Sequence, residues 1–251
     1  MSALSCKVTG NNYKLFPMLV SLNPYDYDQP FPDVSLALDE PNGLLAVGGC
    51  LSPRRLVNAY RQGIFPWFGE DEPILWWSPN PRLVLFPENL HVSRSLRKTL
   101  KKAEFNYSVD RCFEQVIEAC AEPRDYALGT WISPEIKQAY CHLHTLGLAH
   151  SFEAWQEGCL VGGLYGLSIG QVFFGESMFH RASNASKAAF SYAVGQLQQW
   201  GFRLIDCQVY TDHLTSLGAE EIPRSTFIEL LDSLCGLPPA VNAWHVGRVV
   251  G

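Results

Sequence analysis

The stretch 149-AHSFEAWQEGCLVGGLYGLSIGQVFFGESMF-179 decides the fold class. It divides into three apolar runs, residues 149–155, 159–170 and 171–179, and the breaks between them contain glycine. Apolar runs of this length, joined by short glycine-containing turns, are typical of strands that pair antiparallel with their sequence neighbours. This part of the chain therefore predicts a sheet of three consecutive antiparallel strands.

The residues downstream predict a helix, a strand and a helix. Residues 185–200 place Phe190, Ala193, Val194 and Leu197 on one face at helical spacing, and Gly201 suits the stop that follows. The apolar run 203-RLIDCQVY-210 reads as a strand, and a last helix is expected after residue 225. Strands followed by alternating helices and strands predict an α+β fold.

The first part of the chain is organised differently. Residues 1–33 are rich in Pro, Asn, Tyr and Asp, which predicts an irregular arm. Ser52 suits the N-cap of a helix that ends near Gly63, and an aromatic, turn-rich stretch leads from there to a short strand at 83–86. Further helices are expected after Ser93, after Asp110 and over 134–147. We expect a small N-terminal domain over residues 1–88 and a larger one over 89–251.

The composition excludes several classes of protein. The 251 residues carry a net charge of −6, which argues against non-specific coating of nucleic acid but not against a local basic patch. No apolar run approaches the roughly 20 residues that span a bilayer, and the first residues do not resemble a secretory signal. None of the eight cysteines forms a CxxC pair. The pattern favours free thiols in a reducing cytoplasm and indicates no metal.

Acidic and amide side chains interrupt two of the apolar strands. Asp206 and Gln208 are two residues apart, so a strand places both on one face, and Glu176 lies between Phe174 and Met178 on one face of another strand. A carboxylate in such surroundings is costly unless it is hydrogen-bonded or used. Asp206 could act in catalysis or pair with an arginine. Glu176 could hold a cation or tie the sheet to the small domain.

Two further groups of side chains suit a nucleic acid. One face of the helix after Ser93 gathers positive charge that could bind backbone phosphates or simply face solvent, from Arg94, Arg97, Lys98, Lys101 and Lys102. Four tryptophans could stack on bases or pack in the core, namely Trp67, Trp76, Trp77 and Trp131. The helix start near Ser183 or Asn184, with Lys187 in its first turn, could bind phosphate or carboxylate. It lacks the glycine-rich turn that cradles the pyrophosphate of coenzyme A.

The chain resembles the bacterial leucyl/phenylalanyl-tRNA–protein transferase family over residues 35–235. The longest matching stretch is EPNGLLAVGGCLSPRRLVNAYRQGIFPWF, and the shorter ones include PILWWSPNPR, GTWIS, LVGGLYG, FFGESMF, NASKAAF, LIDCQV and DHLTSLGAEEIPR. The resemblance implies a small N-terminal domain followed by an acetyltransferase-like (GNAT-type) domain with a mostly antiparallel sheet. It implies no cofactor and a cytoplasmic location.

The resemblance also implies an activity. Leu-tRNA or Phe-tRNA donates its amino acid to proteins that begin with Arg or Lys, which marks them for degradation by the N-end rule pathway. By motif, Asp206 and Gln208 match the catalytic pair, Glu176 matches the residue facing the acceptor's basic side chain, and residues 94–102 match the acceptor-stem surface. Trp67 and Trp131 match aromatic residues around the tRNA 3′-adenosine.

The donor's side chain should enter an apolar pocket built from residues such as Leu164, Met178 and Ala193. Leu164 stands where we expect Met and Ala193 where we expect a large aromatic residue, so the preference between Leu and Phe is open. We expect Asp206 to orient the acceptor's amine and Gln208 to complete a hydrogen-bond relay. Two alternatives are an acetyl-CoA-dependent N-acetyltransferase and a non-catalytic RNA- or peptide-binding adapter.

Overall fold

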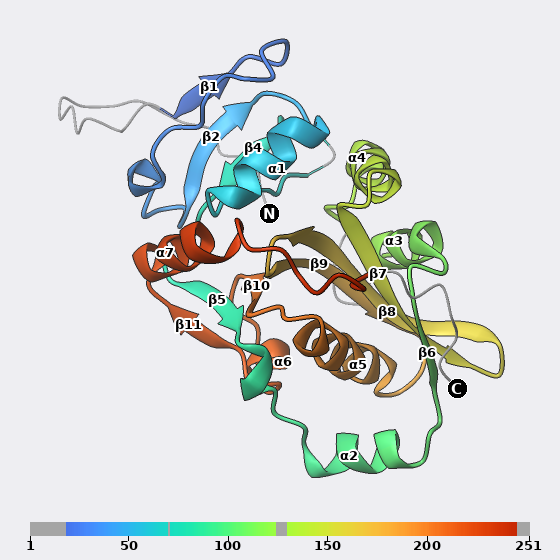
Figure 1. The fold of residues 1–251 in the computed structure, drawn as a ribbon. Coiled ribbons are helices and arrows are strands. Elements are labelled where there is room, and N and C mark those ends of the chain that lie inside the picture. The colour runs from blue at the N-terminus through green and yellow to red at the C-terminus, as the bar shows by residue number, and fades with distance from the viewer. Residues whose placement is uncertain (1–18, 70, 124–129, 245–251) are drawn as a thin grey trace, which may run out of the picture.

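Two sheets organise the chain in the computed structural model, which describes residues 19–69, 71–123 and 130–244 (Figure 1). The smaller sheet contains, in spatial order, β1 (Val20–Leu22), β2 (Leu44–Gly48), β4 (Leu75–Trp77) and β3 (Phe65–Pro66). The larger sheet contains, in spatial order, β11 (Glu220–Ile222), β5 (Arg82–Leu85), β10 (Leu204–Gln208), β9 (Val172–His180), β8 (Cys159–Ile169), β7 (Ala149–Gln156) and β6 (Asn106–Val109).

The larger sheet is mostly antiparallel. The predicted strands β7, β8 and β9 pair antiparallel in sequence order, and only β9 and β10 run parallel. That parallel pairing ends early, because it joins residues 172–174 of β9 to residues 204–206 of β10 while both strands continue beyond it. The α+β class and the mostly antiparallel sheet are confirmed.

Helices cover both faces of the larger sheet. α3 (Phe113–Ala121) and α4 (Pro134–Thr145) lie on one face, and α5 (Ala185–Gln199) lies on the other (Figure 1). α1 (Pro53–Arg61) and α7 (Arg224–Leu234) lie between the two sheets, and α2 (Arg94–Lys101) lies beyond α5. The remaining helical pieces are η1 (Val34–Leu36), η2 (Pro87–Asn89) and α6 (Asp212–Thr215).

Most of the residues expected to begin or end helices do so. The hydroxyl of Ser52 accepts a hydrogen bond from a backbone N–H in the first turn of α1, as predicted, and α2 begins after Ser93, which caps it in the same way. Ser133, which was not predicted as a cap, does the same for α4. Gly63 ends α1 with a positive φ of 71°. α5 differs, because its N-cap is Asn184, whose side chain makes no capping bond.

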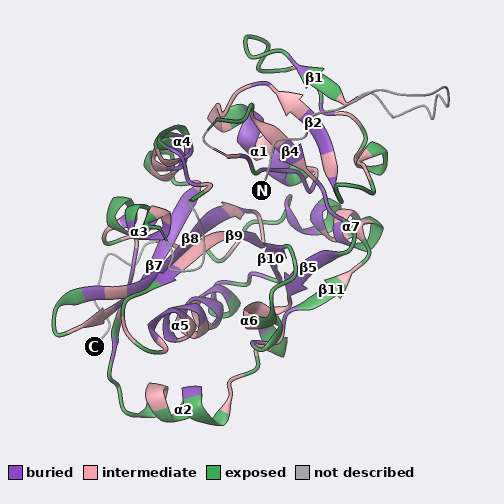
Figure 2. Ribbon diagram, turned by 180° about the vertical axis from the view of Figure 1, so that it is seen from behind, coloured by how far each residue is buried: buried purple, intermediate pink, exposed green. Residues whose placement is uncertain are grey.

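The buried residues form two cores, one on each face of the larger sheet (Figure 2). The first core contains the inward faces of α3 and α4 and continues into α1 and the smaller sheet. The second core lies under α5 and contains its predicted inward residues Phe190, Ala193, Val194 and Leu197. Because the first core runs through both sheets, it fixes the smaller sheet against the larger one.

The first part of the chain departs from the expectations in two places. Residues 20–22 of the expected irregular arm form β1, which pairs parallel with β2; residues 1–18 lie outside the described residues. β5, at 82–85, belongs to the larger sheet, so the chain passes from one sheet to the other between Trp77 and Arg82. That is upstream of residue 88, and the division into domains at 88 stays a prediction.

Gly162 sets how closely α5 approaches the sheet. A Cβ at this position would lie 2.8 Å from both the Cβ and the carbonyl carbon of Ala185, the first residue of α5. A backbone atom cannot rotate away as a side chain can, so the helix would have to shift. The LVGG sequence of β8 therefore places the N-terminus of α5 directly on the sheet.

We predict that Gly162→Ala lowers the free energy of unfolding by about 1–3 kcal/mol, because overpacking forces backbone shifts. Urea denaturation of the wild type and the variant measures this difference in the free energy of unfolding. Gly195→Ala is the matched control, since a Cβ there meets nothing within 4 Å in the middle of α5. That substitution should raise stability by about 0.5–1 kcal/mol through helix propensity. Equal effects of the two substitutions would contradict the close approach.

Candidate active site

A cavity of about 740 Å³ opens where β9 and β10 separate. It has two chemically different ends. The end beneath α5 is apolar, and its lining includes Leu164, Phe173, Met178, Phe190, Ala193, Val194, Leu197 and Ile205. The end that faces α1 and α4 is polar and aromatic, and its lining includes Trp67, Trp131, Tyr165, Glu176, Asp206 and Gln208. The opening between the strands connects the two ends.

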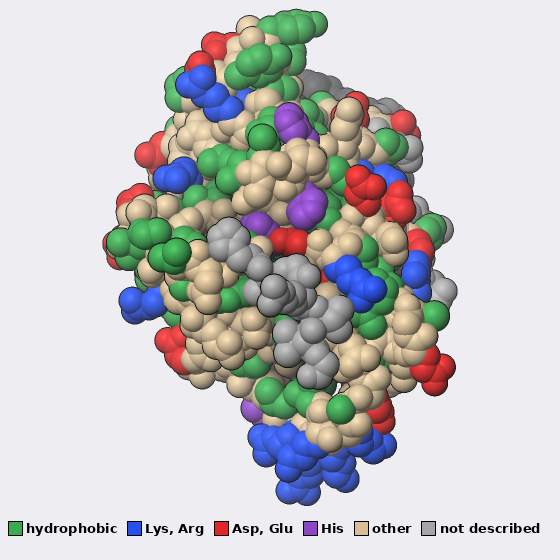
Figure 3. Space-filling model, turned by 45° about the vertical axis from the view of Figure 1, so that its right-hand side comes forward, with side chains coloured by type: hydrophobic (Ala, Val, Ile, Leu, Met, Phe, Trp, Pro, Cys, Tyr) green, Lys and Arg blue, Asp and Glu red, His purple; other side chains and the backbone are tan. Residues whose placement is uncertain are grey.

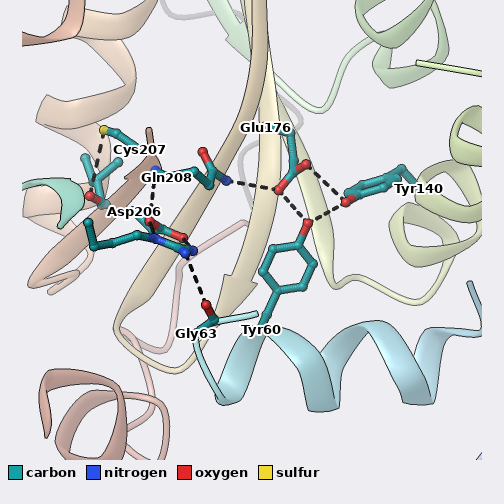
Figure 4. Close-up of polar contacts among 9 residues, drawn as sticks. Tyr60, Gly63, Tyr140, Glu176, Asp206, Cys207 and Gln208 are labelled. Carbon is teal, nitrogen blue, oxygen red and sulfur yellow. Dashed lines mark hydrogen bonds and ion pairs between the residues drawn. The ribbon is translucent and has the colours of Figure 1, made fainter. Parts of the chain in front are cut away.

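Asp206 forms a buried ion pair with Arg82 (Figure 4). Arg82 Nε donates to Asp206 Oδ1 over 2.7 Å, and Nη2 donates to Oδ2 over 2.6 Å. The third nitrogen, Nη1, donates to the carbonyl of Gly63 over 3.1 Å, and the guanidinium lies between the rings of Phe65 and Phe227. The open alternative that Asp206 pairs with an arginine is therefore what the geometry shows.

The pair also fixes Gln208. Its backbone N–H donates to Asp206 Oδ1 over 3.0 Å, and its φ is +57°, a left-handed conformation that costs energy for a residue with a side chain. The side chains of Asp206 and Gln208, which alternation predicts on one face of the strand, both face the smaller sheet. Asp206 bonds to Arg82, and Gln208 Nε2 donates to Glu176 Oε1 over 3.3 Å. Asp206 thus positions the amide that meets the cavity.

Glu176 lies at a bulge in β9, where the register with β8 shifts. Its carboxyl group is hydrogen-bonded to the hydroxyls of Tyr60 (2.6 Å) and Tyr140 (3.1 Å), and these two hydroxyls also bond each other, so the three bonds share the two phenol protons and the carboxyl proton (Figure 4). Burial raises the pKa of Glu176 to about 8, and the nearby negative charge of Asp206 adds to the shift. The hydrogen bond to Tyr60 also ties the larger sheet to α1.

This carboxylate has no cationic side chain bonded to it among the described residues, because the guanidinium of Arg82 is held by Asp206. A carboxyl group with a raised pKa and no bonded cation favours binding of a positively charged group, which would restore its ionised form. The polar end of the cavity is therefore suited to a cationic ligand group.

The other predicted residues fall into two places. Leu164, Met178 and Ala193 line the apolar end, and Trp67 and Trp131 line the polar end. Trp67 is 45% exposed, while Trp76 is fully buried and packs in the core. The five basic residues of 94–102 line no part of the cavity. They form an exposed cluster on α2 and at its C-cap, Lys102, at one end of the molecule (Figure 3).

Sequence reasoning missed several residues of this site. Arg82, Tyr60 and Tyr140 carry its hydrogen bonds, and Ser186, His180 and His213 also line the cavity. A signal for Arg82 was present, because it opens an apolar strand and a buried arginine requires a partner. Among the described residues, no group of three or more His, Cys, Asp or Glu side chains is arranged to hold a metal.

Comparison with known proteins adds the family. The model described as leucyl/phenylalanyl-tRNA protein transferase matches residues 84–232, and that of its N-terminal domain matches residues 49–80. The chain belongs to the leucyl/phenylalanyl-tRNA–protein transferase family. The proteins of that name from Methylococcus capsulatus and Cellvibrio japonicus are 59% and 63% identical to it. The matches cover 90% and 85% of this chain and 97% and 90% of the relatives.

Solved structures resemble the chain only distantly. One is L-PGS from Bacillus licheniformis, with a TM-score of 0.38 and 11% identity over 66% of this chain and 55% of that one. Another is a GCN5-related N-acetyltransferase from Kribbella flavida, with a TM-score of 0.35 and 14% identity over 67% and 60%. Within the described residues, none of the helices has the length and apolar character needed to cross a membrane.

We predict that Asp206→Asn lowers the free energy of unfolding by about 3–5 kcal/mol, because it leaves the buried charge of Arg82 without its partner. The control is Asp28→Asn, which breaks an exposed pair with Arg54 and should cost less than about 1 kcal/mol. Chemical denaturation compares the two variants. A loss no larger than that of the control would show that the Arg82 pair does not hold the sheet together.

The pKa of Glu176 predicts a pH signature. With a folded pKa of about 8 against an ordinary value of 4.5, the folded protein binds one more proton than the unfolded chain between these pH values. The free energy of unfolding should therefore fall as pH rises from about 4.5 to 8. Glu176→Gln cannot ionise and resembles the neutral carboxyl group, so its free energy of unfolding should lie closest to that of wild type near pH 4.5 and exceed it increasingly as pH rises toward 8, as denaturation at several pH values would measure. A constant difference would rule out the shift.

Proposed function

We propose that this chain transfers leucine or phenylalanine from aminoacyl-tRNA to the N-terminal amine of proteins that begin with Arg or Lys. The family to which it belongs joins an aminoacyl-tRNA donor to a protein acceptor. The observation that supports this pair of substrates is one cavity with an apolar end and a carboxylate end that meet at the opening between β9 and β10. The product would carry an N-end rule degradation signal, and the reaction would take place in the cytoplasm.

The apolar end suits the side chain of the donor's amino acid. Leu164, Met178 and Ala193 lie on three different elements, so the pocket has apolar walls on several sides. Such pockets discriminate by only about 1–3 kcal/mol per methylene, so shape must exclude β-branched residues. Trp67 and Trp131, at the other end, would stack against the 3′-terminal adenosine.

The carboxylate end suits the first residue of the acceptor. The positive side chain of Arg or Lys would bind Glu176, whose raised pKa indicates that a cation is favoured there. Gln208 Nε2, already beside Glu176, would lie where the acceptor's backbone enters. Asp206 would act through the position that it gives to Gln208, since Arg82 occupies both of its oxygens.

The reaction forms an amide and breaks an ester. The neutral α-amine, whose ordinary pKa is about 7.7–8.0, attacks the ester carbonyl carbon of the donor. The bond between that carbon and the ribose oxygen then breaks, and the amine's proton passes to the ribose oxygen, directly or through a neighbouring hydroxyl or water. The ester is already activated, so the protein's part is to hold the two groups together and orient them.

Mass spectrometry of an acceptor peptide tests the proposal. The protein is incubated with Phe-tRNA, acetyl-CoA and a peptide that starts with Arg. A gain of one phenylalanyl group is the expected result. A gain of an acetyl group would replace the proposal with acetyl-CoA-dependent N-acetylation, and an unchanged peptide would leave a binding protein without this activity.

For acceptor recognition, we predict that Glu176→Gln raises the KM for an Arg-starting peptide by about tenfold or more, because a hydrogen bond to a charged group contributes roughly 1.5–3 kcal/mol. The KM for Phe-tRNA should stay within about twofold, since neither the donor's side chain, at the apolar end, nor its adenosine, against Trp67 and Trp131, is held by Glu176. Steady-state kinetics with each substrate varied in turn separates the two constants. An equal loss for both substrates would reject the role.

The basic cluster on α2 predicts a salt dependence. Replacing Lys98 and Lys101 by Ala should weaken binding of tRNA and lower the slope of log affinity against log salt by roughly 0.9 for each phosphate that is no longer neutralised. Lys137, which pairs with Glu118 on the other face of the sheet, is the control, and Lys137→Ala should leave the slope unchanged. Filter binding at several salt concentrations measures it. A slope equal to wild type in the double variant would place the tRNA elsewhere.

A further inference from the structure

The N-terminus of α5 meets the cavity at a group of polar atoms that the proposed chemistry does not use. Ser186, in the first turn, is only 6% exposed and lines the cavity, yet its hydroxyl makes no hydrogen bond with any residue that the structure describes. A hydroxyl that is free on a cavity wall can donate a hydrogen bond to a ligand there, and accept one from it.

The same helix end offers backbone donors. The N–H groups of Ser186 and Lys187 lie in the first turn, where an α-helix has no carbonyl of its own to accept from them. The N-cap side chain does not compensate, because Asn184 Nδ2 donates to Thr99 on α2 over 3.4 Å and its side chain caps nothing. The N-terminus of a helix as long as α5 carries a partial positive charge that favours anions.

Lys187 and two histidines lie at this end of the helix. His180 and His213 line the cavity, and Nε2 of His213 is buried with no hydrogen-bond partner among the described residues. Burial lowers the pKa of His213, and the nearby charges of Lys187 and His180 lower it further. Of the carboxyl groups that line the cavity, Glu122 is paired with Arg181 and Asp206 with Arg82, and Glu176 is hydrogen-bonded to Tyr60 and Tyr140 at the end that faces α1 and α4. At the start of α5, the helix N-terminus and Lys187 favour an anionic ligand.

The position of the site identifies the kind of anion. α2, with its basic cluster, contacts this end of α5 through the hydrogen bond between Thr99 and Asn184. A strand of nucleic acid that binds phosphates on α2 and delivers its 3′ end to the cavity would pass the N-terminus of α5. Its backbone carries one phosphodiester for each nucleotide, so one of these groups would lie beside Ser186.

We propose that the N-terminus of α5, with the hydroxyl of Ser186, the ammonium of Lys187 and the imidazole of His213, binds a phosphodiester near the 3′ end of the donor RNA. This inference rests on the proposed function and adds a contact to it. The backbone N–H groups and the serine donate to the phosphate oxygens, and Lys187 supplies charge. The contact holds the single-stranded end in register, so that its terminal adenosine reaches the cavity.

Two donors that differ in phosphate separate this contact from the rest of the site. The first is the trinucleotide CCA that carries phenylalanine on its 3′ adenosine, and the second is 3′-phenylalanyl-adenosine without phosphate. Ser186→Asp places a negative charge at the site while remaining favourable for a helix N-terminus. Lys187→Ala is the second variant, and Ser191→Asp, on the same helix but away from the cavity lining, is the control.

With Ser186→Asp, the KM for the trinucleotide should rise at least tenfold, with Lys187→Ala about threefold, and with the control less than twofold. The KM for phenylalanyl-adenosine should change less than twofold in every variant. Equal changes for the two donors, or an unchanged KM for the trinucleotide, would overturn the inference.

Direct binding of the unacylated CCA trinucleotide, measured by calorimetry, keeps this inference distinct from the proposed function. If wild type transfers no amino acid, the proposed function fails. Even then, weaker binding of the trinucleotide by Ser186→Asp than by wild type would support the phosphate contact. Coenzyme A serves as a competitor in the same measurement. Competition by coenzyme A that Ser186→Asp relieves would assign the site to a cofactor pyrophosphate and overturn the assignment to RNA.

Discussion

The structure depends on the buried ion pair between Arg82 and Asp206. Arg82 opens β5, the strand at which the chain enters the larger sheet, and Asp206 lies on the neighbouring strand β10. The guanidinium also holds the carbonyl at the end of α1 and packs between two aromatic rings. One side chain therefore connects the small sheet, the large sheet and α7. Loss of either partner would leave a buried charge uncompensated, which costs about 3–5 kcal/mol in other proteins.

The site follows from this constraint. Asp206 fixes the backbone of Gln208 just beyond the point where β9 and β10 stop pairing. A bulge in β9 places Glu176 opposite, and Tyr60 and Tyr140 orient its carboxylate. The cavity is thus framed by two strands whose separation is set by buried polar contacts. Geometry of this kind can hold two substrates at a fixed distance without a mobile element.

Much of the fold was predictable because local patterns and tertiary structure agree. The three strands over 149–179, the cap at Ser52 and the inward face of α5 all follow from periodicity and capping. β1 was missed because three residues carry too little pattern to identify a strand. The strand at β5 was predicted, but its place in the larger sheet between β11 and β10 was missed, because both partners lie more than a hundred positions away in the sequence.

The sequence predicts which residues line the candidate site, but not which residues they are hydrogen-bonded to. Asp206, Gln208, Glu176 and the apolar lining residues do lie around one cavity. The sequence does not show that Arg82 occupies the carboxylate of Asp206, because this pairing joins positions 124 residues apart. Nor does it show that Tyr60, from a different sheet's helix, orients Glu176. Long-range polar pairs depend on the packed fold and leave no periodic signal.

The asymmetry between the two ends of the cavity makes the proposed modification self-limiting. A protein that has received Leu or Phe presents an uncharged first residue, whereas the carboxylate held by Tyr60 and Tyr140 favours a positive one. The modified chain therefore no longer has the feature by which it was admitted and competes poorly with fresh acceptors. On the proposed function, a single residue would be added to each target, and the hydrogen bonds around Glu176 would set that limit.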